Sequence, residues 1–78
     1  MKKIICKVEY DTEKSELVAR NTFGAFGDKD GYEEILYVTE TGKYFLYTIG
    51  GEDSKYPQEN ITRMSAVKAD EWRKAHNL

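Results

Sequence analysis

Residues 33–51 constrain the fold more than any other stretch, because two runs rich in β-branched and aromatic residues flank the short segment Glu40-Thr41-Gly42. A type I turn followed by a glycine in the left-handed region closes two antiparallel strands over a segment of this kind. We therefore predict a β-hairpin in which Thr39 pairs with Lys43 and Gly42 has a positive φ.

This register decides which side chains of the hairpin share a face, because side chains alternate along a strand. One face, called here the aliphatic face, receives Leu36, Val38, Tyr44 and Leu46. The other, called the aromatic face, receives Ile35, Tyr37, Phe45, Tyr47 and Ile49. Since both faces are apolar, the rest of the chain or another molecule must cover each of them.

The segment before this hairpin also reads as extended. Residues 3–10 alternate, with Ile4, Cys6, Val8 and Tyr10 on one side, which predicts a single strand with that side buried. Turn-forming residues 11–15 precede a second extended run at 16–21. We expect the two runs to pair as a second hairpin.

Residues 22–32 contain three glycines among Phe23, Phe26 and Tyr32, so we predict an irregular loop. Three aromatic rings in one loop need a surface to cover, and we expect them to fold back over a sheet face. Whether they close the aromatic face or leave it open to a partner is undecided by the sequence. Further along, Ile61 is expected on a short edge strand.

The C-terminal segment changes to a helical pattern. Ser65 is a natural N-cap, and Ala69, Trp72 and His76 recur at spacings of three and four, on one side of a helix. Trp72 is expected to be largely buried and to anchor this helix on the sheet. The chain as a whole, residues 1–78, is predicted to be one α+β domain: a four-stranded, mainly antiparallel sheet of two hairpins, with one C-terminal helix packed on its aliphatic face.

Composition restricts the classes of partner. The net charge is −2, and residues 28–59 carry eight acids against three bases, which argues against a nucleic-acid binder. No apolar run is long enough for a membrane span or a signal peptide, so we expect a protein of the cytoplasm. The single cysteine, Cys6, rules out an intramolecular disulfide and is expected to be a small buried residue.

The residues provide no catalytic set, and we expect neither an enzyme nor a bound metal or cofactor. His76 lies close to the C-terminus and is expected to be a solvated helix-end cation rather than a general base. Asp28-Lys29-Asp30-Gly31 resembles the start of an EF-hand, but its glycine comes too early and Thr39 stands where the bidentate Glu is required. The acid pairs Glu33-Glu34 and Glu52-Asp53 lack an adjacent His, so they do not indicate a metal site.

The pattern of the second half is similar to that of a family of small proteins from phages, plasmids and integrated elements of Gram-positive bacteria, to which no biochemical activity is attached. The matching residues are Leu36-Tyr37-x-Thr39-x-Thr41-Gly42-x-Tyr44-Phe45-Leu46-Tyr47, Gly50-Gly51-x-x-Ser54-Lys55-Tyr56, and Ile61-Thr62 with Ser65, Ala69 and Trp72. The resemblance implies a mobile-element setting. Small proteins of that setting often bind and block a host defence component, as anti-CRISPR inhibitors do.

We therefore predict a non-enzymatic binding module that acts stoichiometrically on a host protein. Its predicted binding surface is the aromatic face, with Tyr37, Tyr47 and Tyr56 at the centre and Glu33 and Glu52 on an acidic rim. A second copy of the chain is the other occupant considered for this surface.

The alternative function is small-ligand binding at the loop of residues 50–56. Gly50, Gly51, Ser54 and Lys55 offer backbone amides, a hydroxyl and an ammonium group for a nucleotide or another anion, and Tyr56 offers a ring for stacking.

Overall fold

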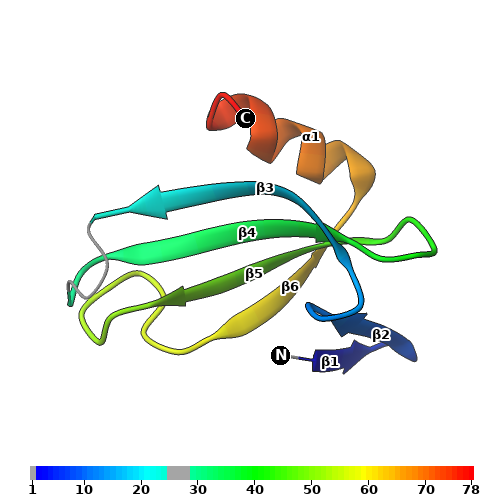
Figure 1. Ribbon diagram of the computed structural model, residues 1–78, viewed down its shortest axis with the longest axis horizontal. Coiled ribbons are helices and arrows are strands. Elements are labelled where there is room, and N and C mark those ends of the chain that lie inside the picture. Colours follow the sequence, from blue (N-terminus) through cyan, green and yellow to red (C-terminus); the bar gives the residue numbers. More distant parts are fainter. Residues whose placement is uncertain (1, 25–28) are drawn as a thin grey trace.

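A computed structural model describes residues 2–24 and 29–78 and has an α+β architecture, as the sequence predicts. The elements are β1 (Lys2–Ile5), β2 (Val8–Asp11), β3 (Glu16–Phe23), β4 (Tyr32–Val38), β5 (Tyr44–Gly50), β6 (Asn60–Met64) and α1 (Ala66–Ala75). β1 and β2 form a two-stranded sheet, and the other strands form a four-stranded antiparallel sheet in the order β3-β4-β5-β6 (Figure 1).

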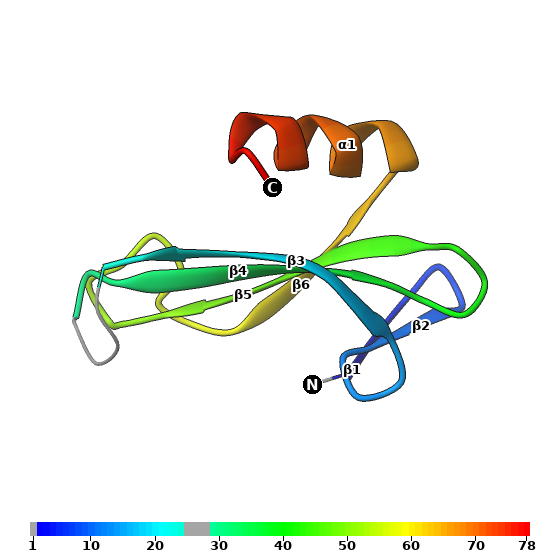
Figure 2. The same cartoon turned by 45° about the horizontal axis from the view of Figure 1, so that its top comes forward.

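The elements are stacked in three layers. Figure 2 shows α1 on one side of the four-stranded sheet and the β1–β2 hairpin on the other side, beneath one end of the strands. No helix within the described ranges is long and apolar enough to cross a membrane.

The central hairpin, β4–β5, has the predicted register. Val38 pairs with Tyr44, Tyr37 with Phe45, Leu36 with Leu46 and Ile35 with Tyr47. In the turn, the Thr39 amide donates to the Lys43 carbonyl at 2.8 Å, and Gly42 has a φ of +82°. The positive φ explains why the turn requires a glycine at this position.

The N-terminal prediction is wrong. Residues 3–10 are not one strand, because the chain reverses at Cys6-Lys7 and β1 pairs with β2 instead of with residues 16–21. Cys6 and Lys7 have φ values of 51° and 66°, the backbone of a two-residue hairpin turn that normally selects Asn and Gly. The turn places Cys6 at an exposed tip, and Ile4 is 66 % exposed rather than buried.

The predicted single four-stranded sheet is therefore replaced by two sheets, with β6 as the fourth strand of the larger one. The predicted loop 22–32 is also shorter, because β3 continues to Phe23 and β4 begins at Tyr32. These two rings stack on each other, with centroids 5.1 Å apart, on the side of the sheet that faces α1. Phe26 lies outside the described residues.

The helix covers the aliphatic face, as predicted. Ser65 is the N-cap, and its Oγ accepts a hydrogen bond from the Lys68 amide at 3.1 Å. The core on this side consists of Leu36, Leu46 and Ala69, with Val18, Ala19, Tyr44, Met64 and Trp72 packed around it. Trp72 anchors the helix on the sheet: its side chain packs against this core, and its Nε1 is fully enclosed.

The β1–β2 hairpin covers part of the aromatic face. Its Tyr10 packs edge-on against Phe45, with ring centroids 5.5 Å apart, and both residues form a core cluster with Ile61. Ile5, Val8, Tyr37 and Tyr47 pack against this cluster. Among the described residues, the shield over the aromatic face therefore comes from the N-terminal hairpin and not from the aromatic rings of segment 22–32.

Candidate functional site

The β1–β2 hairpin leaves two large apolar side chains exposed on the aromatic face. Leu17, opposite Tyr37, is 48 % exposed, and Ile49, opposite Glu33, is 39 % exposed. Tyr37 and Tyr47 lie between them and are partly buried. We call Leu17, Tyr37, Tyr47 and Ile49 the open stripe, which runs across three strands of the sheet.

The two tyrosines of the open stripe are held in place by neighbouring side chains. Tyr37 stacks on Phe45 with a centroid distance of 5.2 Å and an angle of 12° between the rings. The Tyr47 hydroxyl donates to Glu59 Oε2 at 2.8 Å. Burial, and then this bond to Glu59, raises the pKa of Tyr47 to about 12, so the phenol remains a neutral donor at physiological pH.

Glu33 lies opposite Ile49, at the margin of the open stripe. Its Oε1 is 3.2 Å from Arg20 Nε on the neighbouring strand, and the two form an ion pair that is partly open to solvent. The predicted rim residue Glu52 lies in the loop after β5, where it pairs with Lys29 at 3.4 Å. Both side chains of this second pair are about three-quarters exposed, so solvent weakens their attraction. Because Glu33 is paired with Arg20, the rim at Glu33 is a mixed-charge pair rather than an acidic cluster.

Tyr56 does not join Tyr37 and Tyr47. Its hydroxyl donates to Glu34 Oε2 at 2.6 Å, and Glu34 alternates with Ile35 and so lies on the face covered by α1. The Tyr56 ring also meets the Tyr32 ring edge-on at 5.3 Å. The three predicted tyrosines are therefore divided between the two faces of the sheet.

The loop of residues 50–56 uses most of its donors within the protein. The amide of Gly51 donates to Gly31, that of Asp53 to Lys29 and that of Ser54 to Gly51, at 2.9, 2.9 and 3.1 Å. The Ser54 hydroxyl donates to the Gly51 carbonyl at 2.7 Å and accepts from the Tyr56 amide at 3.1 Å. The Lys55 ammonium lies 5.4 Å from the centre of the Tyr56 ring. Few groups of this loop are left to hold an anion.

Gly50 has a packing role at this point. A Cβ on Gly50 would lie 2.8 Å from both the Gly31 carbonyl oxygen and Tyr32 Cβ and would also collide with Ser54 Oγ. The glycine thus allows the end of β5 to approach the start of β4.

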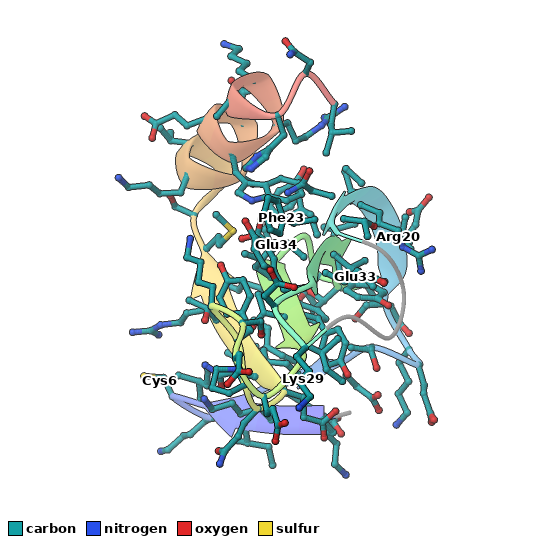
Figure 3. The ribbon with its side chains drawn as sticks, turned by 90° about the vertical axis from the view of Figure 1, so that its left-hand side faces the viewer. Cys6, Arg20, Phe23, Lys29, Glu33 and Glu34 are labelled. Carbon is teal, nitrogen blue, oxygen red and sulfur yellow. The ribbon has the colours of Figure 1, made fainter. Side chains whose placement is uncertain are left out.

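A buried carboxylate on the helix side is not evident from the sequence. Glu34 is 5 % exposed, accepts a hydrogen bond from Asn21 Nδ2 at 3.1 Å in addition to that from Tyr56, and lies 3.7 Å from His76 Nε2. In Figure 3, Glu34 lies directly below α1, whereas Arg20 and Glu33 lie further from the helix. Burial, and then the bond to Glu34, raises the pKa of Tyr56 above its ordinary range.

His76 belongs to this network rather than to bulk solvent, which corrects the prediction of a solvated helix-end cation. Its Nδ1 lies 2.8 Å from the Trp72 carbonyl oxygen, and its ring packs against the Trp72 indole at 4.8 Å. The network ties the last turn of α1 to β3, β4 and the loop before β6. These contacts fix the end of the helix against the sheet.

Residues 2–24 and 29–78 contain no group of three or more His, Cys, Asp or Glu side chains arranged to hold a metal ion. Comparison of the chain with models of known protein families, with curated proteins and with solved structures finds no match.

Proposed function

We propose that this chain is a non-enzymatic binding module that docks a partner protein on the open stripe and acts on it stoichiometrically. The observation that carries the proposal is the exposure of Leu17 and Ile49 beside the half-buried rings of Tyr37 and Tyr47. Exposed aliphatic groups next to anchored tyrosines are typical of the centre of a protein interface.

The ring contacts of the tyrosines add to this argument. Because Tyr37 stacks on Phe45 and Tyr47 is hydrogen-bonded to Glu59, neither ring loses much conformational freedom when a partner covers it. The Arg20–Glu33 pair at the margin supplies a polar rim that can exchange its internal ion pair for contacts with the partner.

The edge of the sheet next to Leu17 also favours a protein partner. β3 pairs with β4 on one side, and no described strand pairs with its other side (Figure 1). Its register shifts between Leu17 and Ala19, and from Ala19 to Phe23 the pairing with β4 is regular. Such an edge offers main-chain donors and acceptors to an incoming strand.

The mobile-element resemblance supports a host protein as the partner, in the cytoplasm of a bacterial host. A component of a defence system such as CRISPR–Cas is the partner class that this setting favours. Small-ligand binding at the loop of residues 50–56 has less support, since the loop amides of Gly51, Asp53, Ser54 and Tyr56 already donate within the protein.

The test is quantitative capture of partners from lysates of Gram-positive bacteria, with the tagged chain as bait. The variant Leu17→Glu/Ile49→Glu places two charges in the open stripe, and the matched control Val67→Glu places one on a helix residue that is 67 % exposed. We expect at least one host protein to bind the parent chain and the Val67→Glu control and to be lost from the double variant.

Identical capture by all three baits would contradict the proposal. Light scattering on the same three proteins identifies a second copy as the occupant, if the parent and the control are dimers and the double variant is a monomer. Melting curves must remain similar, because the substituted side chains are all exposed in the folded chain.

A further inference from the structure

A second feature lies at the start of α1, away from the open stripe. A cavity of about 420 Å³ opens where the β4–β5 turn and the end of β6 meet the first residues of the helix. Its lining consists of Tyr10, Gly42, Lys43, Tyr44, Arg63, Met64, Ser65 and Ala66. Two of these residues are cationic and none is acidic, in a chain whose net charge is −2.

The two cations are unpaired. Lys2, Arg20, Lys29, Lys68 and Lys74 each have a carboxylate within 4.0 Å, whereas Lys43 and Arg63 have none among the described residues. Both side chains are exposed, so water and salt screen their mutual repulsion, and an anion held between them would be attracted by both charges. The lining therefore has a positive charge that nothing in the described chain neutralises.

The helix end adds further donors. Ser65 Oγ accepts from the Lys68 amide and the Ser65 carbonyl accepts from the Ala69 amide, at 3.1 and 2.9 Å. The amides of Ala66 and Val67 precede the first intrahelical bonds and have no acceptor among the described residues. The first turn has no acidic side chain, so the positive end of the helix dipole is also unopposed.

A buried side chain points to a ligand independently of the helix end. Tyr10 is only 4 % exposed, yet it lines the cavity, and no described residue hydrogen-bonds its hydroxyl. In the described part of the chain, Trp72 Nε1 is the one fully enclosed side-chain polar atom without a partner. The Tyr10 hydroxyl is therefore not fully enclosed, and Tyr10 belongs to the lining of the cavity.

We propose that this cavity binds a phosphate dianion, either as inorganic phosphate or as the phosphoryl group of a small monoester. The guanidinium of Arg63 suits two phosphate oxygens, and the Lys43 ammonium adds a point charge. The Tyr10 hydroxyl and the amide of Ala66, the last lining residue, donate to the remaining oxygens. The site is separate from the open stripe, and it does not depend on the proposed protein partner.

The test is a titration of the full chain at constant ionic strength, in which binding is monitored by NMR through the chemical shifts of the backbone amides. The probes are inorganic phosphate and phosphoserine, with sodium chloride as the reference anion. We expect saturable shifts at Ala66 and Val67 with both phosphates and none with chloride. Tighter binding of phosphoserine assigns the site to monoesters, and equal binding assigns it to free phosphate.

The variant Arg63→Gln should raise the dissociation constant about tenfold or more, because it removes charge-assisted hydrogen bonds. Arg73→Gln, at the opposite end of α1, is the matched control and should leave the constant unchanged. Tyr10→Phe retains the buried ring and should weaken binding about threefold through loss of one neutral donor. If Arg63→Gln fails to fold, Lys43→Gln provides the same test at an exposed position.

Shifts that rise linearly without saturation would overturn the proposal. Equal binding by Arg63→Gln, Lys43→Gln and Arg73→Gln would overturn it as well.

Discussion

The two faces of the sheet are covered by different means. Over the aliphatic face lies a helix of 10 residues, and beneath it the apolar cluster of Leu36, Leu46 and Ala69 adjoins the buried polar side chains of Glu34 and Thr48. Over the aromatic face lies a hairpin of two strands with 4 residues each, and the cluster of Tyr10, Phe45 and Ile61 contains no charged group.

The difference lies in how each cover is held on the sheet. On the helix side, the Glu34 network connects the last turn of α1 with β3, β4 and the loop before β6, so the position of the cover is specified by hydrogen bonds. On the hairpin side, the cover is held by ring packing and by Lys3 Nζ, which donates to Asn60 Oδ1 and to the Ile61 carbonyl at 3.1 and 3.4 Å. This cover is too small, which leaves Leu17 and Ile49 exposed. The face with the smaller cover is therefore the one on which large apolar side chains remain exposed.

Removal of the Phe45 ring, on the hairpin side, should have the largest effect on the free energy of unfolding. Phe45 is fully buried and touches both Tyr10 and Tyr37, so Phe45→Ala should lower the free energy of unfolding by about 3–5 kcal/mol. Urea denaturation measures this loss. A loss as small as that of the exposed control Val67→Ala would show that the hairpin contributes little to the core.

The second largest loss of stability is expected on the helix side, on substitution of Glu34. Glu34→Ala leaves the Tyr56 hydroxyl and the Asn21 amide without their acceptor and should cost about 2–3 kcal/mol. Glu34→Gln retains an acceptor oxygen of similar size and should cost less. If both variants unfold at the same urea concentration, the charge rather than the hydrogen bonds would be the source of the anchoring.

A matched pair of phenols compares the faces directly. Tyr56 and Tyr47 both donate to a glutamate, but the acceptor of Tyr56 is buried and that of Tyr47 is exposed. Tyr56→Phe should cost about 1–2 kcal/mol, and Tyr47→Phe less than about 1 kcal/mol. The opposite order in thermal or urea unfolding would remove the distinction between an anchoring face and a binding face.

The smallest loss of stability is expected when the pH is raised. The pKa of Tyr47 is raised from 10.0 to about 12 in the folded chain, so folding favours the protonated phenol. Its contribution to stability is complete below pH 10 and is lost as the pH rises from 10 to about 12. Urea unfolding at several pH values in this window should show the loss, and Tyr47→Phe should reduce it. A phenolate absorbance titration in which Tyr47 ionises at its ordinary value would contradict the assignment.

Local signals account for the parts of the fold that the sequence predicts correctly. The turn at Glu40-Thr41-Gly42 and the alternation on both sides of it are sufficient for the register of β4 and β5. Ser65 and the spacing of Ala69 and Trp72 are sufficient for the start and the buried side of α1. The choice of the aliphatic face for the helix followed from the hydroxyl groups on the other face.

The failures lie where the determining contact is distant or atypical. Cys6 and Lys7 adopt left-handed backbone conformations that neither residue type indicates. The alternation of apolar and polar residues therefore predicts one continuous strand where the chain in fact turns. Glu34 is buried because Asn21, Tyr56 and His76 converge on it from other elements. Tyr56 lies on the helix side and not beside Tyr37 and Tyr47 for the same reason, because its hydroxyl donates to the distant residue Glu34.

The order of the elements along the chain has a consequence for synthesis on the ribosome. The β1–β2 hairpin is made early, but the surface that receives Tyr10 is complete only when Ile61 has been added. At ordinary translation rates the interval of about fifty residues lasts about 3–10 seconds. During that time the apolar side of the hairpin lacks the complete surface that covers it in the folded chain.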